Sequence, residues 1–202
     1  MNPKALFDAI RTIKGSALTQ AEVDAVNCAL GETAAAASKC GMAASPTGIA
    51  LIHSFETLKL KSYPDPGSKD GKPVTNGWGT TRDEGGGPIP LGAIWTPEKA
   101  DRLFARDRRD VEVGVNLLLR GKATTQAQFD ALVMFAYNVG LTEFGTSTLL
   151  RMHLAGDFGA WDAKRGTGTG AVGQFPRWNK NDGTVMAGLV RRRAAEAALY
   201  AA

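Results

Sequence analysis

Apolar and polar residues alternate at helical spacing near the N-terminus. Residues 3–14 place apolar side chains on one face, which predicts a short amphipathic helix. Thr19 followed by Glu22 is a capping-box pattern, which predicts a second helix that runs into an alanine-rich stretch. A small, polar segment separates both helices from the remainder of the chain. We therefore expect a helical hairpin module over residues 1–43 and a second domain over residues 44–202.

The next helix is predicted to begin at Ser45-Pro46, because proline is favoured at the first helical position. It is expected to run to about Lys59, and its apolar residues surround most of its circumference, as in a buried helix. Residues 60–95 are rich in glycine and proline, which favours short strands and turns over helix. This stretch is therefore where we expect a small sheet.

The rest of the chain has a predominantly helical pattern. A long amphipathic helix is predicted from Thr96 to Gly121, with its charges on the outer face. Thr125 and Gln128 form a capping box before a stretch that is apolar on every side up to Gly140, which predicts a helix at the centre of the core. Further helices are expected over residues 147–155, 157–163 and 186–200. The predicted fold class is α+β, mostly helical with one small irregular β region.

Composition narrows the classes of protein that fit this pattern. The apolar fraction is 44% and the charged fraction 22%, which is ordinary for a soluble globular chain. The sequence has no apolar run of roughly 18 residues, so stable membrane insertion is not expected. The N-terminal segment lacks the apolar core of a signal peptide, so we expect synthesis and folding in a cytoplasm. A monomer is the default expectation.

The sequence offers little support for metal or cofactor chemistry. Cys28 and Cys40 have no cysteine or histidine partner at zinc-ligand spacing, and in a cytoplasm we expect both thiols to be reduced. A disulfide between them stays open if the protein reaches an oxidising compartment. The two histidines, His53 and His153, are far apart in the sequence. We therefore expect neither a metal nor a cofactor.

The net charge of +4 is concentrated at the C-terminal end. Residues 151–202 carry 8 basic and 4 acidic residues, whereas the two signs balance in the preceding part of the chain. A basic surface suits a polyanionic partner such as nucleic acid, an anionic lipid or the bacterial cell wall. The alternative is a solvated helix with spare arginines, and charge alone does not choose between them.

Two carboxylates nine positions apart are the most specific chemical signal. Glu56 lies near a predicted helix end on the face of Ile49 and Ile52, where burial and the helix dipole both favour its protonated form. Asp65 lies between two prolines in a predicted turn, where a carboxylate stays ionised. One protonated and one ionised carboxyl group are the equipment of a glycosidase. Each residue also has a simpler interpretation: Glu56 could pair with Lys59 or a distant arginine, and Asp65 could merely shape its turn.

Thr75 and the run Gly77-Trp78-Gly79 come after this pair. Alternate glycines let a backbone or a substrate approach closely, and Thr75 is either a residue that holds water or an ordinary strand residue. Together these residues resemble the phage-type lysozymes of glycoside hydrolase family 24. That family has an apolar helix ending in Glu, an Asp nine residues on, and then Thr-x-Gly-x-Gly before a Thr or His. The matching residues here are Glu56, Asp65, Thr75, Gly77, Gly79 and Thr80.

The resemblance covers roughly residues 46–200, with further matching segments over 135–140, 147–151, 174–178 and 188–196. Nine residues separate Asp65 from Thr75, more than in many members, which implies a longer hairpin turn. The resemblance implies a lysozyme-like fold. Substrate-binding residues are expected at Trp78, Tyr137, Asn138, Gln174 and Trp178.

The resemblance also implies a reaction: hydrolysis, with inversion, of the β-1,4 bond between N-acetylmuramic acid and N-acetylglucosamine in peptidoglycan. Glu56 would protonate the glycosidic oxygen. Asp65 would activate a water on the opposite face of the sugar, and Thr75 would help to place that water. No cofactor would be required.

A biological setting is implied by the same likeness. An endolysin is made in the host cytoplasm, reaches the periplasmic cell wall through a phage holin pore, and binds peptidoglycan and not nucleic acid. The arginines over 191–193 would face that anionic polymer, or they would pair with the acidic outer face of the helix over 97–120. Two other functions stay open: a non-catalytic cell-wall-binding module, and a lytic transglycosylase, which cuts the same bond without water and can work with one Glu.

Overall fold

A computed structural model describes residues 3–18, 23, 26, 41–64 and 70–202 of the chain. In these parts the protein is α+β as predicted: mostly helical, with three short antiparallel strand pairs. The helices are α1 (Pro3–Lys14), α3 (Pro46–Phe55), α4 (Pro97–Leu119), α5 (Gln126–Val139), α6 (Leu141–Thr146), α7 (Thr148–Ala155), the 3-10 helix η2 (Val172–Arg177) and α8 (Ala187–Tyr200). The strand pairs are β1 (Lys59–Pro64) with β2 (Val74–Gly77), β3 (Trp161–Asp162) with β4 (Thr167–Gly168), and β5 (Lys180–Asn181) with β6 (Thr184–Val185).

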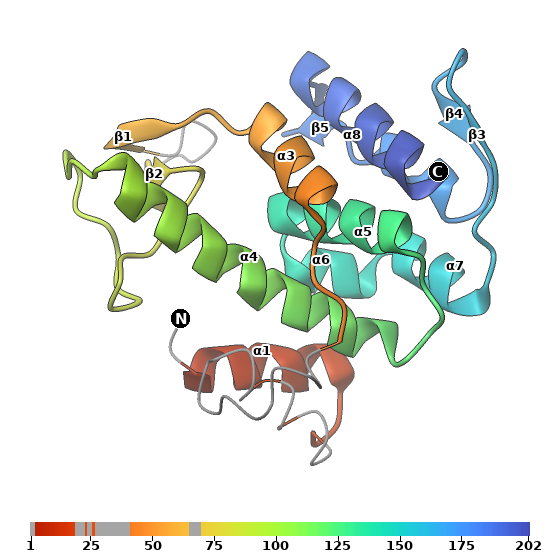
Figure 1. Cartoon of the computed structure of the whole chain (residues 1–202), viewed down its shortest axis with the longest axis horizontal. Helices are drawn as coiled ribbons and strands as arrows, with labels where there is room; N and C mark the ends of the chain where they lie inside the picture. The colour runs from red at the N-terminus through yellow and green to blue at the C-terminus, as the bar shows by residue number, and fades with distance from the viewer. Residues whose placement is uncertain (1–2, 19–22, 24–25, 27–40, 65–69) are drawn as a thin grey trace.

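Figure 1 shows how these elements are arranged. The long helix α4 runs from the β1–β2 hairpin at one end of the molecule to the group formed by α5, α6, α7 and α8. Helix α3 lies between the hairpin and α8. None of the helices in the described parts of the chain is both long and apolar enough to cross a membrane.

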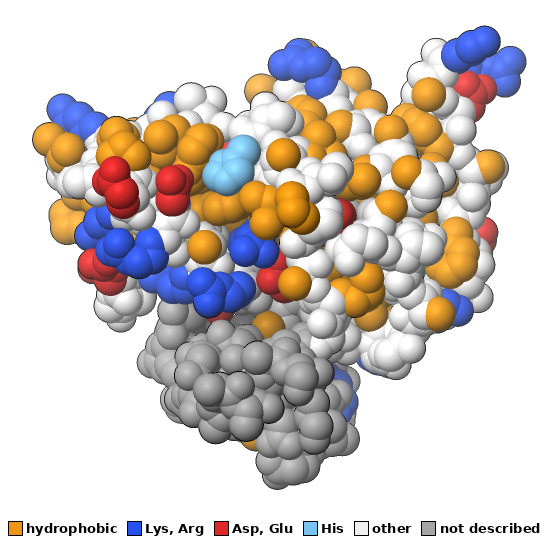
Figure 2. All heavy atoms as spheres, in the orientation of Figure 1, with side chains coloured by type: hydrophobic (Ala, Val, Ile, Leu, Met, Phe, Trp, Pro, Cys, Tyr) orange, Lys and Arg blue, Asp and Glu red, His pale blue; other side chains and the backbone are white. Residues whose placement is uncertain are grey.

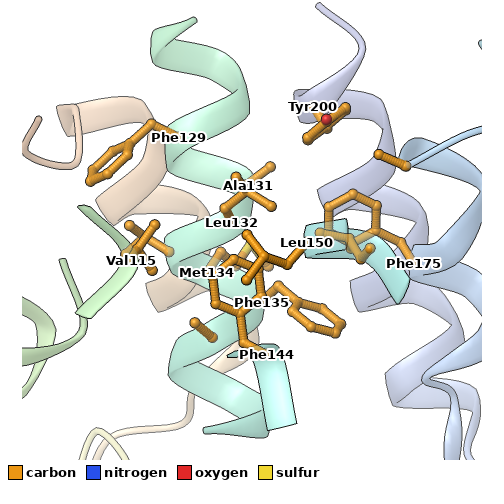
Figure 3. Packing of buried hydrophobic residues seen from close by; sticks show 14 of the residues in the cluster. Val115, Phe129, Ala131, Leu132, Met134, Phe135, Phe144, Leu150, Phe175 and Tyr200 are labelled. Atoms are coloured by element: carbon orange, nitrogen blue, oxygen red, sulfur yellow. The ribbon is translucent and has the colours of Figure 1, made fainter. Parts of the chain in front are cut away.

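Helix α5 is the centre of the core, as its all-round apolar pattern predicted. Its capping box between Thr125 and Gln128 is formed on both sides, and the helix is buried from Gln128 to Ala136. Figure 3 shows Phe135 in the middle of the surrounding rings. Phe135 makes edge-to-face contacts with Phe144 and Phe175, with ring centroids 6.2 and 5.5 Å apart. Such aromatic pairs add to the free energy gained by burial.

Helix α3 begins where the sequence predicted and ends earlier. The Ser45 side chain accepts a hydrogen bond from the Gly48 amide, and Pro46 is the first helical residue. The helix ends at Phe55 and not near Lys59, because the backbone of Glu56 is already extended (φ −95°, ψ 134°) and the chain turns into β1.

The start of α3 is fixed on α5 by the buried carboxylate of Asp130. Its Oδ1 accepts hydrogen bonds from the Ser45 amide at 2.9 Å and from Nε2 of Gln126 at 2.8 Å, and its Oδ2 accepts one from the Ser45 hydroxyl. A Cβ on Gly48 would lie 2.7 Å from the Asp130 carboxyl carbon, so the two helices can approach this closely only with glycine there. Glu56 therefore extends from a helix whose other end is anchored in the core.

Helix α4 buries two of the charged residues expected on its outer face. Asp110 and Glu112 are buried, and the segment before α3 covers Glu112. Glu112 accepts a hydrogen bond from the Ala44 amide at 2.9 Å and pairs with Arg108. Asn116 exchanges two hydrogen bonds with the backbone of Met42, at 2.7 and 2.9 Å. The segment that looked like a loose linker is thus bonded along α4.

Three other segments differ from the sequence prediction. The helix expected over residues 157–163 is absent; this region contains β3, which pairs with β4 across a turn. Helix α6 and the 3-10 helix η2 were not predicted. Most of the second N-terminal helix, together with Cys28 and Cys40, lies outside the described residues, and the domain boundary near residue 43 stays a prediction.

Candidate active site

Glu56 follows the last residue of α3, and its side chain is 20% exposed. Its Oε1 accepts a hydrogen bond of 2.6 Å from Nη1 of Arg192 on α8. On the other side, a Cβ on Gly79 would lie 3.5 Å from its Oε2. The sequence predicts apolar surroundings for Glu56, and the contact with Arg192 shows that this prediction is wrong. The simpler interpretation, an ion pair with a distant arginine, is confirmed.

Arg192 belongs to a buried cluster of four charged side chains. Its Nε lies 3.4 Å from Oε1 of Glu196, which also accepts a hydrogen bond of 2.8 Å from Nη2 of Arg193. Arg193 in turn donates to Oδ1 of Asn138 at 2.8 Å. Arg192 and Arg193 thus pair with groups on α3, α5 and their own helix. The prediction that they pair with the outer face of α4 is wrong for these two.

The turn after β2 brings backbone close to Glu56. Asn76 and Thr80 exchange backbone hydrogen bonds of 2.9 and 3.0 Å, which close the turn. Gly77 and Gly79 have φ values of 63° and 98°, in the left-handed region that favours glycine. The alternate glycines of the sequence therefore form a tight turn that places Gly79 beside the carboxylate.

Trp78, between these glycines, connects the turn to three helices. Its indole Nε1 donates to Oδ1 of Asp101 on α4 at 2.7 Å, and its carbonyl accepts from the Tyr137 hydroxyl of α5 at 3.2 Å. Its ring makes an edge-to-face contact with the ring of His53 on α3, with the two ring centroids 4.2 Å apart. Burial raises the pKa of Tyr137 and lowers that of His53, so we expect both to be neutral at pH 7.

Two cavities adjoin these residues. The larger, of about 760 Å³, lies among the ends of α3 and α5, η2, β5 and the start of α8. It has no acidic residue in its lining, and its basic residues are Arg177, Lys180, Arg191 and Arg192. We call it the basic cavity. The smaller, of about 390 Å³, lies beside Gly79 and Tyr137 and includes Asp107 and Asp110. Asn138 lines both cavities.

In the part of the chain that the structure describes, no three or more His, Cys, Asp and Glu side chains are close enough together to hold a metal ion.

The family model for phage lysozyme matches residues 53–196, which contain every element of this site. The chain belongs to the phage lysozyme family. An endolysin of Bacillus phage PZA is 40% identical over 159 residues, an alignment that covers 79% of this chain and 55% of that endolysin. The chain thus spans about half the length of the Bacillus phage endolysins that it matches.

Solved structures of phage lysozymes and related domains share the fold. The endolysin from Escherichia coli O157:H7 phage FAHEc1 is 32% identical, with a TM-score of 0.65 over 79% of this chain and 94% of that chain. The muramidase domain of SpmX from Asticaccaulis excentricus is 31% identical, with a TM-score of 0.61 over 78% of this chain and 97% of that one. The lysozyme-like fold expected from the sequence is confirmed.

Two of the three predicted catalytic residues lie in described parts of the structure. Glu56 lies at the junction of α3, α8 and the glycine turn. Thr75 is in β2, opposite Tyr63 of β1, and it is 9% exposed. Asp65 follows the last residue of β1 and lies outside the described residues. The catalytic roles of all three stay predictions.

The predicted substrate-binding residues are separated by the fold. Trp78 and Tyr137 are joined to each other at the glycine turn beside Glu56. Trp178 lines the basic cavity, and Asn138 lines both cavities. Gln174 is in η2, where its Nε2 donates to the Gly170 carbonyl and its Oε1 accepts from Arg177, both at 3.4 Å. Like Trp78 it lines neither cavity, whereas Tyr137, Asn138 and Trp178 each line at least one.

Arg192 and Glu196 lie in a segment that matches the family pattern, but neither was predicted as a residue of the catalytic site. A partial signal existed, because a glutamate that follows two arginines by three and four positions lies on their side of a helix. That spacing predicts the pairing within α8. It does not predict the contact with Glu56, which is 136 residues away in the sequence.

Proposed function

We propose that this phage lysozyme is an endolysin muramidase, which hydrolyses the β-1,4 bond between N-acetylmuramic acid and N-acetylglucosamine in peptidoglycan. The observation that carries the proposal is the position of Glu56. Its carboxylate is partly exposed, held by Arg192, and placed at the junction of α3, α8 and the glycine turn. Similarity to a muramidase domain supports the choice of bond.

Glu56 acts as the general acid in this proposal. It transfers its proton to the glycosidic oxygen as the bond breaks, and a positioned acid of this kind accelerates a reaction by about 10²–10⁴. The absence of a side chain at Gly79 leaves room beside Oε2 for the leaving oxygen. The Arg192 guanidinium stabilises the carboxylate that remains after proton transfer.

Asp65 and Thr75 supply the attacking water in this proposal. Asp65 acts as the general base on the opposite face of the sugar, and Thr75 helps to orient the water. Inversion requires the two carboxyl groups to be about 6.5–9.5 Å apart, since the water must fit between them. An experimental structure in which the Asp65 carboxyl lies about 5 Å from that of Glu56 would instead favour a retaining reaction.

The basic cavity gives the cell wall a place to bind beside Glu56. It joins basic groups to the apolar surfaces of Phe55, Trp178 and Met186, which suits an anionic polymer with sugar and peptide parts. On the face shown in Figure 2, many of the basic side chains lie beside acidic ones, so that face as a whole is not strongly basic. The clustered charges of the cavity, more than the net charge of the chain, therefore support peptidoglycan as the partner.

Glu56→Gln tests the proposed acid. We expect lysis of outer-membrane-permeabilised Gram-negative cells to fall by at least about a hundredfold, while the unfolding temperature stays near that of the wild type. Glu143→Gln is the matched control, because Glu143 is an exposed glutamate on α6, and it should lyse normally. Full activity in Glu56→Gln would overturn the proposal.

The cut glycan separates the remaining alternatives. A hydrolase leaves reducing ends, whereas a lytic transglycosylase leaves anhydro ends. A wall-binding module leaves the glycan intact while it still sediments with peptidoglycan. We expect reducing ends only, and loss of the reaction in Asp65→Asn.

The proposed setting is synthesis in the host cytoplasm and release to the periplasmic wall through a holin. Deletion of the holin gene should delay or prevent lysis although the enzyme accumulates in the cell. Light scattering at increasing concentration should show a monomer.

A further inference from the structure

We propose that Glu196 is a positioning residue for the reaction: by sharing Arg192 with Glu56, it keeps the acid in place without fixing it as a carboxylate. This inference rests on the proposed function, in which Glu56 is the general acid. It goes beyond that function by giving a fully buried residue of α8 a role in the pH dependence of lysis.

The geometry places one guanidinium between two carboxylates. Arg192 turns Nη1 to Glu56 at 2.6 Å and Nε to Glu196 at 3.4 Å, and its Nη2 lies 3.5 Å from the Met134 carbonyl on α5. It is 4% exposed, so water does little to weaken these interactions. The orientation of Arg192 toward Glu56 therefore depends on Glu196 behind it.

The charges of the cluster balance only with Glu196 ionised. Arg192 and Arg193 are the cations, and Glu56 and Glu196 the anions. If Glu196 were uncharged, Glu56 would be the one carboxylate left, among the described residues of this cluster, to balance the two buried guanidinium groups of Arg192 and Arg193. That excess of positive charge would hold Glu56 ionised, which is the wrong state for an acid.

Two titratable groups on the neighbouring helices α3 and α5 act on this cluster, and both are neutral near pH 7. His53 of α3 and Tyr137 of α5 both interact electrostatically with Glu56, and burial keeps each uncharged. Glu196 itself is affected in the relevant range: burial raises its pKa to about 7, against the opposing effect of the two arginines. Burial also lowers the pKa of Arg193, to about 10. Among these groups, Glu196 is thus the one whose charge changes near neutral pH.

Stability alone is a poor reason for such a cluster. Removing charges from water costs free energy, and apolar side chains of similar size commonly stabilise a core as well or better. Oε2 of Glu196 and Nε and Nη1 of Arg193 are buried without a hydrogen-bond partner in the structure described, which adds to the cost. The arrangement is therefore better explained by its contact with Glu56.

Glu196→Gln tests the role, because glutamine keeps the shape of the side chain and removes its charge. The measurement is kcat and KM for peptidoglycan hydrolysis from pH 5 to 9. We expect the alkaline limb of kcat to move to lower pH by about one unit, which is a tenfold loss at alkaline pH, with KM unchanged. Below about pH 6 the two proteins should converge, since wild-type Glu196 is then protonated as well. Glu196→Asp, which restores the charge, should restore much of the alkaline activity.

Tyr200→Phe is the matched control on the same helix. It removes a buried hydrogen bond to His153, so it should lower stability and leave the pH profile in place. If Glu196→Gln reduces kcat equally at every pH, or leaves kcat unchanged, Glu196 is merely structural and the inference is wrong.

A second variant decides between these outcomes if Glu196→Gln does not fold. Arg192→Met removes the cation that favours ionised Glu56, so the alkaline limb should move in the opposite direction, to higher pH. An unmoved limb in Arg192→Met overturns the inference. The proposed function has its own test, because it is wrong if Glu56→Gln stays active. If Glu56→Gln is inactive but the alkaline limb of kcat does not move in Glu196→Gln and Arg192→Met, only the role of Glu196 is contradicted.

Discussion

The hydroxyl of Tyr137 donates a hydrogen bond of 3.2 Å to the backbone carbonyl of Trp78, and so joins the central helix α5 to the glycine turn at the site. Burial raises the pKa of Tyr137, which keeps the hydroxyl protonated and able to donate at every pH at which the enzyme would act. This bond fixes the peptide unit between Trp78 and Gly79, next to Glu56.

Tyr137→Phe should loosen that turn. The ring and its edge-to-face contact with Phe104 remain, and only the hydrogen bond is lost. We expect a loss of about 1 kcal/mol in the free energy of unfolding and of about 2–4 °C in the unfolding temperature. Amide hydrogen exchange over residues 76–80 should become faster. In Asp101→Ala, which frees the indole but not this carbonyl, exchange there should change less; equal exchange in wild type and Tyr137→Phe would contradict the prediction.

Much of the fold is determined by signals that are local in the sequence. The capping box at Thr125 and Gln128 sets the start of α5, and its apolar circumference places it in the core. Helix α3 begins at Ser45-Pro46 for the same kind of reason. Such signals act within a turn or two of helix, so a single sequence is enough to show them.

The parts of the fold and site that were predicted wrongly depend on contacts between segments that are distant in the sequence. Glu112 resembles an outer-face residue until the segment before α3, about 70 positions away in sequence, covers it. The helix expected over 157–163 is replaced by a hairpin. A Cβ on Gly159 would lie 1.8 Å from the Thr169 carbonyl oxygen, so the glycine allows the two segments to approach. In the same way, nothing near Glu56 in the sequence predicts Arg192 as its partner.

The contact between Ile13 of α1 and Gly145 of α6 tests whether the N-terminal helix is part of the lysozyme domain. A Cβ on Gly145 would lie 2.7 Å from Cγ2 of Ile13. Gly145→Ala should therefore destabilise the protein by about 1 kcal/mol, although alanine is the better helix former by a similar amount. In an Ile13→Ala background the methyl group has room, and the same change should become neutral or stabilising.

A double-mutant cycle measured by urea unfolding gives the coupling between these two sites. A coupling of about 1 kcal/mol or more indicates that α1 is docked on α6 during the global transition. If the effects of the two substitutions simply add, residues 1–43 behave as the separate module predicted from the sequence.

His153 should make the protein sensitive to mild acid. It is fully buried, with Nδ1 2.6 Å from the Tyr200 hydroxyl and Nε2 2.9 Å from the Thr124 hydroxyl. Burial, and secondarily Lys122, lowers its pKa from 6.5 to about 4. Between these values the unfolded chain binds a proton that the folded protein does not, so stability is present above about pH 6.5 and is lost as the pH falls toward 4.

The size of this loss is at most about 3 kcal/mol. Chemical unfolding at several pH values should show it in the wild type, and His153→Gln should be less stable at pH 7 but lose less stability on acidification. An NMR titration in which the His153 ring protonates near pH 6.5 would refute the assignment.

Gly77 and Gly79 allow the backbone of the turn and its contact with Glu56 to be tested separately. Both have positive φ, so alanine at either position is strained, and each change should cost about 1–2 kcal/mol of stability. Their surroundings differ. A Cβ on Gly77 would meet the Cβ of Ala100 in the core at 3.1 Å, whereas a Cβ on Gly79 would lie 3.5 Å from Oε2 of Glu56.

Below the unfolding temperature of both variants, we expect Gly77→Ala to keep most of the lytic activity per folded molecule. Gly79→Ala should lose about tenfold or more, because its methyl group occupies the space beside the acid and restricts the approach of the glycosidic oxygen. Equal activities in the two variants would show that the space beside Oε2 is not used, and that Glu56 meets its substrate from another side.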